Sequence, residues 1–314
     1  MRVSNVSGVS VHTGSGDLSA AATNPVVGSL KGYIALTKPR IIELLLVTTV
    51  PTMFVAARHL PSARLVVMTL IGGALAAGGA NAMNMIYDRD IDAVMERTKH
   101  RPLVTGAVSV RGAMIFAAAL EVAAFLLLWQ TVNLLSAALA VSATAFYVLV
   151  YTMWLKRSSS ENIVIGGAAG AVPVLVGWSA VTDSLAWAPI IMFGIIFLWT
   201  PPHFWALAVK YRDDYTKAEV PMLPSVMSME GVTRRILIYT VALWALSLTL
   251  APVAHLGWAY FGVAMVLGAL LFAYAWALRN DPTPKRAMKM FGFSITYLAV
   301  LFIAMGAIAV VLHP

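Results

Sequence analysis

The sequence contains no cysteine, so it forms no disulfide and offers no thiolate nucleophile. Cysteine-ligated zinc and iron–sulfur sites are excluded for the same reason. Charged residues are also scarce, because Asp, Glu, Lys and Arg make up 11% of the 314 residues, against about a quarter in soluble domains. This low charge content argues against a soluble globule.

Long apolar runs are what the sequence has in abundance, since 60% of its residues are hydrophobic. A membrane-spanning helix needs about 20 apolar residues. About nine such runs follow one another, at roughly 41–57, 65–87, 112–130, 134–155, 162–181, 185–207, 236–256, 259–278 and 290–312. Because backbone in lipid must satisfy its own hydrogen bonds, we predict an all-α integral membrane protein with about nine transmembrane helices. This domain is expected to cover residues 31–314, after a disordered tail over residues 1–30.

The positive charges predict the orientation of this bundle. The formal net charge is +8, but the 22 Lys and Arg residues form no basic domain, so we expect no nucleic-acid partner. With the N-terminus inside, all of them except Arg58 and Arg64 fall on the inner side. The positive-inside rule therefore predicts a multi-pass protein of the cell membrane with a cytoplasmic N-terminus and a cytoplasmic active face.

A regularly spaced polar motif closes the second apolar run. Asn84, Asp88 and Asp92 recur every fourth residue, so on a helix they share one stripe, whereas Asp90 points elsewhere. Two carboxylates and an amide at the mouth of a membrane helix suit Mg²⁺, which takes its remaining oxygens from water and substrate phosphates. The motif therefore predicts binding of a magnesium-bound diphosphate. The alternative is a solvated acidic loop whose aspartates pair with its own arginines.

Several cations lie close to this motif in the predicted topology. They are Arg97, Lys99 and Arg101 in the same inner loop, and Lys156 and Arg157 at the inner edge of the fourth run. Arginine binds phosphate oxygens with a two-pronged donor geometry, and lysine with a compact charge. We expect these side chains to bind the diphosphate, although Lys156 and Arg157 are also explained as purely orienting charges.

Two tyrosines, Tyr147 and Tyr151, stand one helical turn apart just inside the membrane, next to these cations. Their π-faces suit a developing carbocation, while the cations at the membrane edge suit the leaving group of an allylic diphosphate. Tyrosine also collects at membrane interfaces without a catalytic role, so that interpretation stays open.

A second polar group lies between the sixth and seventh runs. If a helix restarts after Pro201 and Pro202, then His203, Lys210 and Asp214 fall within about 40° of one another and present imidazole, ammonium and carboxylate on one face. The group is a candidate for ligand binding or proton transfer. The alternative for His203 is a hydrogen-bonded core histidine.

Two glutamates, Glu43 and Glu121, lie inside apolar runs. A carboxylate at mid-membrane costs about 3 kcal/mol unless it is paired, so both are expected to face the bundle interior. Glu43 can pair with Arg40 one turn away, whereas Glu121 has no local partner.

Residues 31–312 resemble the UbiA prenyltransferase superfamily, and within it the branch of farnesyltransferases that modify heme. The Asn-x3-Asp-x3-Asp motif is typical of the whole superfamily, while the Pro-Pro-His-Phe-Trp and Pro-Met-Leu-Pro elements resemble the heme-modifying branch. The matching stretches are residues 36–40, 81–92, 97–102, 156–157, 162–173, 199–205, 210–215 and 221–224.

The resemblance implies helices around a central cavity that opens to the inner side and the lipid. It implies farnesyl diphosphate and heme B as substrates, Mg²⁺ as cofactor, and heme O as product, with a hydroxyethylfarnesyl group in place of one vinyl. Asp88 and Asp92 would hold the metal, oriented by Asn84.

The superfamily has a second Asp-x3-Asp motif, and this sequence departs from it. Lys210 occupies its first position, so only Asp214 remains as a further metal ligand. Because an ammonium repels a metal cation, Lys210 is expected on the diphosphate. His203 would position the water that completes the reaction or ligate the heme iron.

Two other functions stay open. A prenyltransferase acting on an aromatic quinone precursor uses the same diphosphate chemistry, but it does not need the His203 region. A non-enzymatic transporter is also helical, but its site belongs near the midplane, whereas these carboxylates lie at inner helix ends. A downstream heme-modifying enzyme is a candidate partner, because heme is sparingly soluble and reactive.

Overall fold

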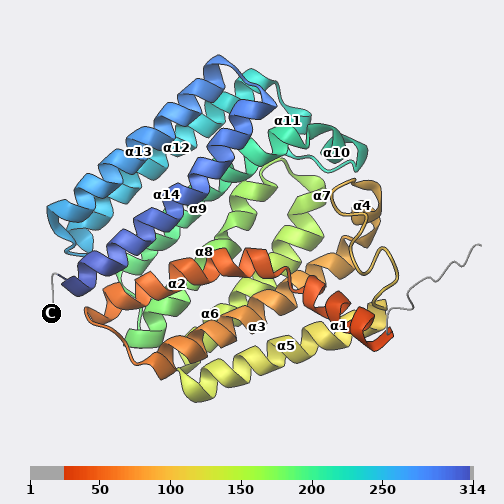
Figure 1. Cartoon of the computed structure of the whole chain (residues 1–314), viewed down its shortest axis with the longest axis horizontal. Coiled ribbons are helices and arrows are strands. Elements are labelled where there is room, and N and C mark those ends of the chain that lie inside the picture. The colour runs from red at the N-terminus through yellow and green to blue at the C-terminus, as the bar shows by residue number, and fades with distance from the viewer. Residues whose placement is uncertain (1–24, 312–314) are drawn as a thin grey trace, which may run out of the picture.

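The computed structural model describes residues 25–311, without the side chains of residues 25–29, 40, 41 and 43–46. Every regular element over this range is a helix (Figure 1), so the predicted all-α class is confirmed. The predicted pair of Glu43 with Arg40 and residues 1–24 of the predicted tail fall outside the described residues.

Nine long helical segments coincide with the nine predicted spans. They are α2 (Pro39–Ala57), α3 (Ala63–Tyr87), α5 (Val110–Thr131), α6 (Leu134–Ala145) continued by η1 (Phe146–Leu155) and α7 (Lys156–Ser158), α8 (Asn162–Thr182), α9 (Trp187–Lys210), α12 (Met229–Val253), α13 (Gly257–Asn280) and α14 (Pro284–Val311). Within the described residues, eight segments are long and apolar enough to cross a membrane, and α2 adds the shorter apolar stretch Val47–Ala57. The chain is therefore a multi-pass membrane protein.

Short helices lie in the loops at one end of the bundle. They are α4 (Arg89–Val94), α10 (Arg212–Lys217) and α11 (Leu223–Val226), while α1 (Pro25–Leu36) precedes the first span and includes residues 25–30 of the predicted tail. Figure 1 shows α4, α7 and α10 at the same end, whereas α14 ends at the opposite one. With an odd number of spans, the first span begins at one end of the bundle and the last span finishes at the other.

The helix α2 closes the bundle. It contacts α3 and α8 as well as α14, so the first and last spans meet. The other half packs around α9, which contacts α8, α12 and α14. Its core contains the buried side chains of Trp199, Tyr260, Tyr297 and Phe302.

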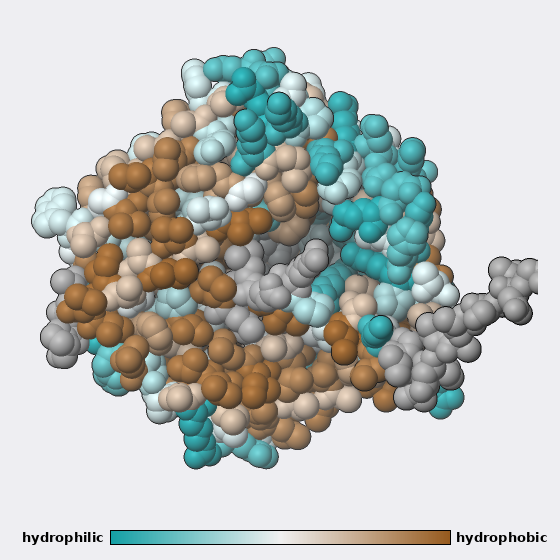
Figure 2. Space-filling view, viewed as in Figure 1, coloured by the Kyte–Doolittle hydropathy of each residue, from teal (hydrophilic) through white to brown (hydrophobic). Residues whose placement is uncertain are grey.

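The surface separates into an apolar and a polar part. Hydrophobic residues cover most of the face seen in Figure 2, and hydrophilic residues gather over the end that carries α4, α7 and α10. Large apolar side chains point outward, such as Trp187 and Trp258, which are 74% and 84% exposed. Lipid solvates such side chains, as expected for a bundle embedded in a bilayer.

The fourth span changes helix type near its inner end. After α6, residues 146–155 form the π-helix η1, in which backbone groups pair five residues apart. Such segments are rare, and they are common at functional sites. Tyr147, Tyr151 and Thr152 all lie on this π-helix.

The two prolines of the sixth span do not start a helix. α9 runs without interruption from Trp187 through Pro201 and Pro202 to Lys210, and Tyr211 separates it from α10. The expected restart after the prolines is therefore wrong, and Asp214 lies on a different helix from His203 and Lys210. Membrane helices tolerate proline because neighbouring helices and hydroxyl side chains satisfy the freed backbone groups. The Thr200 hydroxyl, directly before the two prolines, donates to the Ile196 carbonyl over 2.8 Å.

Close packing of α12 on α13 gives a test of this fold. A Cβ at Gly268 would lie 1.9 Å from the Trp244 ring, whereas one at Gly262, on the same helix, would meet no atom within 4 Å. We expect Gly268→Ala to lower the melting temperature in detergent, because overpacking costs about 1–3 kcal/mol. Gly262→Ala should leave it unchanged or raise it, since alanine favours helix. Equal shifts in the two variants would contradict the packing described here.

Candidate active site

The candidate site lies at the end of the bundle that carries α4, α7 and α10 (Figure 1). α3 ends at Tyr87, and Asp88 is both its last cap and the first cap of α4. The Asp92 amide still donates to the Asp88 carbonyl over 2.8 Å, so helical spacing continues across the junction. Asp88 and Asp92 are both buried. The sequence predicts that they share one stripe of a helix.

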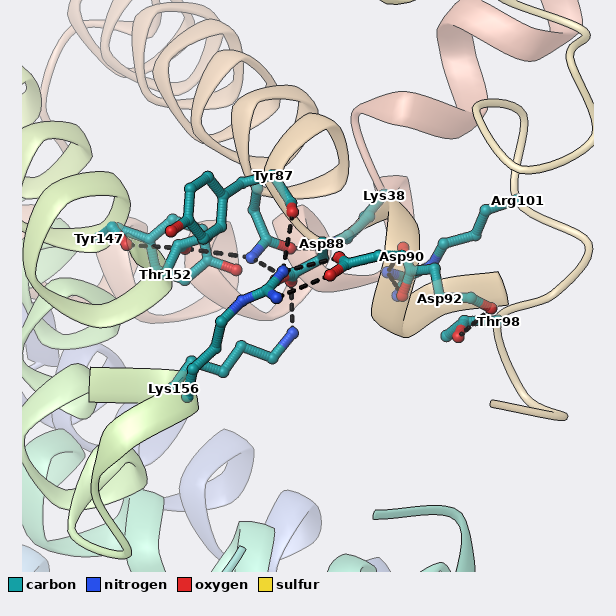
Figure 3. A network of polar contacts seen from close by, with 12 residues as sticks. Lys38, Tyr87, Asp88, Asp90, Asp92, Thr98, Arg101, Tyr147, Thr152 and Lys156 are labelled. Carbon is teal, nitrogen blue, oxygen red and sulfur yellow. Dashed lines mark hydrogen bonds and ion pairs between the residues drawn. The ribbon is translucent and has the colours of Figure 1, made fainter. Parts of the chain in front are cut away.

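Asp88 lies at the centre of the site (Figure 3), where Asn84 bonds to it. The Asn84 Nδ2 donates to the Asp88 Oδ2 over 2.7 Å and to the Thr152 Oγ1 over 3.1 Å. Lys156, from α7, forms an ion pair with the same Asp88 oxygen. The Asp88 carboxylate is 0% exposed, and its charge is therefore balanced inside the protein rather than by water.

Lys38 reaches the same centre from the junction of α1 and α2. Its Nζ donates to the Asn84 Oδ1 over 2.7 Å. Burial, together with the nearby cations Arg101 and Lys156, lowers the pKa of Lys38 to about 7, while Asp88 and Asp92 oppose this shift. Its backbone has a φ of 53°, in the left-handed region, directly before Pro39. Backbone strain of this kind persists where the surrounding structure fixes the residue, and it is common at functional sites.

Asp92 is held by the loop that follows α4. The Arg101 guanidinium donates to both Asp92 oxygens, over 2.8 and 2.6 Å. The Thr98 hydroxyl donates to the Asp92 carbonyl over 3.1 Å and fixes the same loop. Lys99 instead pairs with Glu96 over 2.5 Å at the surface. Between Lys99 and Arg101, it is therefore Arg101 that contacts a predicted metal ligand.

Asp90 points away from the other two aspartates, as predicted. Its two oxygens accept from the Arg157 guanidinium over 2.7 Å each, and Arg157 also lies 5.0 Å from the centre of the Tyr87 ring. The Arg157 hydrogen bond lowers the pKa of the Asp90 carboxyl to about 2. Asp90 is 66% exposed, so Arg157 is turned to the surface rather than to the buried carboxylates.

Arg97 connects this loop to α10. Its guanidinium lies 5.8 Å from the centre of the Tyr211 ring and bonds the Tyr215 hydroxyl. Burial raises the pKa of Tyr215, and the Arg97 charge opposes this rise. Lys210 lies 5.2 Å from the centre of the same Tyr211 ring, on its own helix end. Arg97 thus connects the loop after α4 to the segment around Tyr211, where Lys210 also lies.

The two tyrosines of η1 stack on each other. The ring centres of Tyr147 and Tyr151 are 5.3 Å apart with 22° between their planes. A Cβ at Gly166 of α8 would lie 2.3 Å from the Tyr151 ring, so the glycine is what lets α8 approach this ring. Both tyrosines are half-buried on the span that also supplies Thr152 and Lys156 to the site.

His203 has the environment of a core histidine. Its Nδ1 forms a hydrogen bond of 2.7 Å with the Ser294 Oγ of α14. Its ring stacks between Trp199 and Phe291, with centroids 4.1 and 4.5 Å away. None of these contacts involves a residue predicted for the site, so the structure does not bring His203 together with Asp214.

Glu121 finds a partner that the sequence does not indicate. Its Oε1 accepts from the Thr144 hydroxyl over 3.2 Å, between α5 and α6. A Cβ at Gly79 would lie 2.5 Å from the same oxygen, so the carboxyl also packs tightly against α3. Glu121 therefore faces neighbouring helices, as predicted for a carboxylate within a span.

The donor set fits Mg²⁺ in one respect. The Asp88 Oδ1 is buried and has no hydrogen-bond partner among the described residues, although an orphaned carboxylate oxygen is costly. A hard cation would satisfy it, and Mg²⁺ commonly takes only one or two protein carboxylates beside substrate oxygens. Within the described part of the chain, no three acidic or histidine side chains cluster as a metal site, so Asp214 does not join Asp88 and Asp92.

Two contributors to the site were missed in the sequence. Lys38 is counted there as an inner-side charge and lies in the matching stretch 36–40, but no site role is assigned to it, and Thr152 is one apolar-run threonine among several. Both contact Asn84, from positions 46 and 68 residues away in the chain. The matching stretch around Lys38 and Pro39 is a signal for the first, and we find none for the second.

Comparison with known proteins agrees with this geometry. Residues 45–310 match the UbiA prenyltransferase family. The chain is 51% identical over 294 residues to a protein of Streptomyces avermitilis named protoheme IX farnesyltransferase, covering 92% of this chain and 96% of that one.

Solved structures share the fold at low identity. A structure of digeranylgeranylglyceryl phosphate synthase is 17% identical, with a TM-score of 0.75 over 90% of this chain and 99% of that one. A UbiA homologue of Archaeoglobus fulgidus bound to GPP and Mg²⁺ is 18% identical, with a TM-score of 0.61 over 89% of this chain and 99% of that one. The chain therefore belongs to the UbiA prenyltransferase family, and within it to the protoheme IX farnesyltransferases.

Proposed function

We propose that this protein transfers the farnesyl group of farnesyl diphosphate to a vinyl group of heme B, with addition of water, to give heme O and diphosphate. The observation that carries the proposal is the buried Asp88, which has one unpartnered oxygen and lies among Asn84 and Lys156 at the polar end of a membrane bundle. The names of relatives about half identical to the chain support farnesyl and heme as the substrates.

The diphosphate is proposed to bind at the end of the bundle where the cations converge. Lys156 and Arg101 form ion pairs with the two buried aspartates, and Arg97 and Lys210 lie at the Tyr211 ring between α9 and α10. Lys38 adds a cation that the sequence does not assign to this site. Arg157 is left out of this set, because its guanidinium is held by Asp90 at the surface.

Mg²⁺ would be held by Asp88 and Asp92, with Asn84 orienting the first carboxylate, and when bound it neutralises charge on the departing diphosphate. Asp214, on α10, is proposed only as a ligand to a second ion. The protein's own cations would act on the same leaving group, with Lys156, Arg101 and Arg97 donating hydrogen bonds to its anionic oxygens.

In the proposed reaction, the bond between the farnesyl C1 and the diphosphate oxygen breaks, and a bond from C1 to the terminal vinyl carbon of heme forms. The stacked rings of Tyr147 and Tyr151 lie next to the site and would stabilise the allylic cation through their π-faces. Water then adds to the cation left beside the porphyrin and releases a proton. The apolar interior of the bundle keeps water away from the earlier cation.

The proposed orientation puts the N-terminus and the active face in the cytoplasm. It rests on the distribution of Lys and Arg, which gather at the loops around α4, α7 and α10. Farnesyl chains and heme both partition into lipid, so both substrates would enter from the bilayer. An enzyme that further modifies heme O is proposed as a partner because the product is poorly soluble in water.

One prediction of this function concerns the buried Asp88. Purified protein in lipid with heme B, farnesyl diphosphate and Mg²⁺ is expected to give a new mass of heme O. Asp88→Ala should lower the rate at least about 100-fold, since it removes the central carboxylate. Asp90→Ala is the matched control, because it removes the same three side-chain atoms only two residues away. It should keep its activity, since Asp90 faces the surface.

The acceptor is tested in the same assay. No product from heme, together with turnover of a phenolic acceptor, would overturn heme as the substrate while the diphosphate site stands. Equal activity of the Asp88 and Asp90 variants would contradict the assignment of the site itself.

A further prediction tests the role proposed for His203, which is to position the water or to ligate the heme iron, against the core role that its contacts with Ser294, Trp199 and Phe291 indicate. His203→Ala should lose heme O formation while it binds farnesyl diphosphate normally, as measured by titration calorimetry. The melting temperature separates this role from packing, because His203 holds α9 to α14 through Ser294. If heme O formation and farnesyl diphosphate binding are both lost and the melting temperature falls, His203 is a core residue.

A further inference from the structure

The orientation of the Asn84 amide is fixed by its neighbours. The Lys38 Nζ donates a hydrogen bond over 2.7 Å to the amide oxygen of Asn84. The Asp88 carboxylate only accepts, so the atom 2.7 Å from it must be the amide nitrogen. The remaining hydrogen of Nδ2 then points at the Thr152 hydroxyl oxygen, 3.1 Å away.

The Thr152 hydroxyl has a fixed direction as well. It carries a single hydrogen, which it donates to the Tyr147 carbonyl over 2.9 Å, and its lone pairs face Asn84. The side chain is 0% exposed, so water does not compete for these bonds. A chain of donors thus runs from Lys38 and Asn84 toward Thr152 and ends on the backbone of η1 (Figure 3).

The π-helix makes this contact differ from those of other threonines in the spans. Thr240 of α12 and Thr200 of α9 donate to carbonyls four residues earlier, at Ile236 and Ile196. Thr152 reaches five residues back, which is the spacing of the π-helix. The same segment carries Lys156 one turn further on, so Thr152 and Lys156 both meet the group formed by Asn84 and Asp88.

We propose that Thr152 is a positioning residue for the metal-binding carboxylate: through Asn84 it fixes the direction of Asp88, and so leaves the Asp88 Oδ1 free for the ion. This inference rests on the proposed function, because it assigns Asp88 to metal and diphosphate. Without the hydroxyl, an Nδ2 hydrogen of Asn84 would be buried without a partner, and the amide would turn to find another. Partners of this kind typically change metal affinity or activity by about 10–100-fold.

The experiment compares three variants of the full chain in lipid nanodiscs. Thr152→Val removes the hydroxyl and keeps the shape, Thr152→Ser keeps the hydroxyl, and Thr240→Val is a matched control for loss of a buried threonine hydroxyl outside the site. Binding of Mn²⁺ in the presence of farnesyl thiodiphosphate is followed by electron paramagnetic resonance. The Mg²⁺ dependence of heme O formation is the second readout.

We expect Thr152→Val to weaken Mn²⁺ binding by about 10–100-fold and to raise the Mg²⁺ concentration for half-maximal rate to a similar extent. Thr152→Ser and Thr240→Val should bind Mn²⁺ like the wild type. A Thr152→Ser protein as deficient as Thr152→Val, or a Thr152→Val protein with normal Mn²⁺ binding, would overturn the proposal. Thr152→Ala removes the same hydroxyl and replaces the valine variant if the latter does not fold.

A double-mutant cycle with Asn84→Ala shows whether Thr152 acts through the amide. If it does, Thr152→Val causes no further loss of Mn²⁺ binding once Asn84 is alanine. A full additional loss in that background would overturn the relay. Failure of the proposed function is distinguishable, because a wild type that makes no heme O still allows the Mn²⁺ binding of the variants to be compared.

Discussion

The structure depends on keeping one ionised carboxylate buried at the edge of a membrane. Asp88 is closed off from solvent, and an isolated charge there would cost several kcal/mol. The fold supplies Lys156 as counter-charge and Asn84 as donor, and it brings them from α7 and α3. Breaking a buried pair of this kind costs about 3–5 kcal/mol, so the geometry of the fourth span, of α3 and of the α1–α2 junction is tied to this one group.

Hydropathy predicts the number and order of the spans, because lipid requires long apolar helices and little else. The spacing of Asn84, Asp88 and Asp92 predicts their common stripe, since four residues make little more than one helical turn. Neither signal reaches the parts that depend on tertiary contact. Lys38 and Thr152 meet Asn84 only because three distant segments pack together. A continuous apolar run also does not show where an α-helix changes to a π-helix.

The sixth span shows a different limit of sequence reasoning. Pro201 and Pro202 break a helix in water, and the expected common face of His203 and Asp214 rests on that rule. In the bundle the helix passes through both prolines and breaks at Tyr211 instead. This break places Asp214 on a separate helix from His203. His203 faces Ser294 and the aromatic rings of α9 and α14, and Lys210 and Arg97 both lie at the Tyr211 ring.

The pairing of the aspartates with Lys156 and Arg101 has a consequence for how a substrate is selected. In the proposed function, binding would be an exchange of partners: the carboxylates would pass from ammonium and guanidinium to a metal, and the released cations would pass to phosphate. The free energy of binding would then be a difference between two complete sets of ion pairs. An anion without a metal would leave the carboxylates unmatched, so such a site would discriminate against free phosphate by counter-ion exchange.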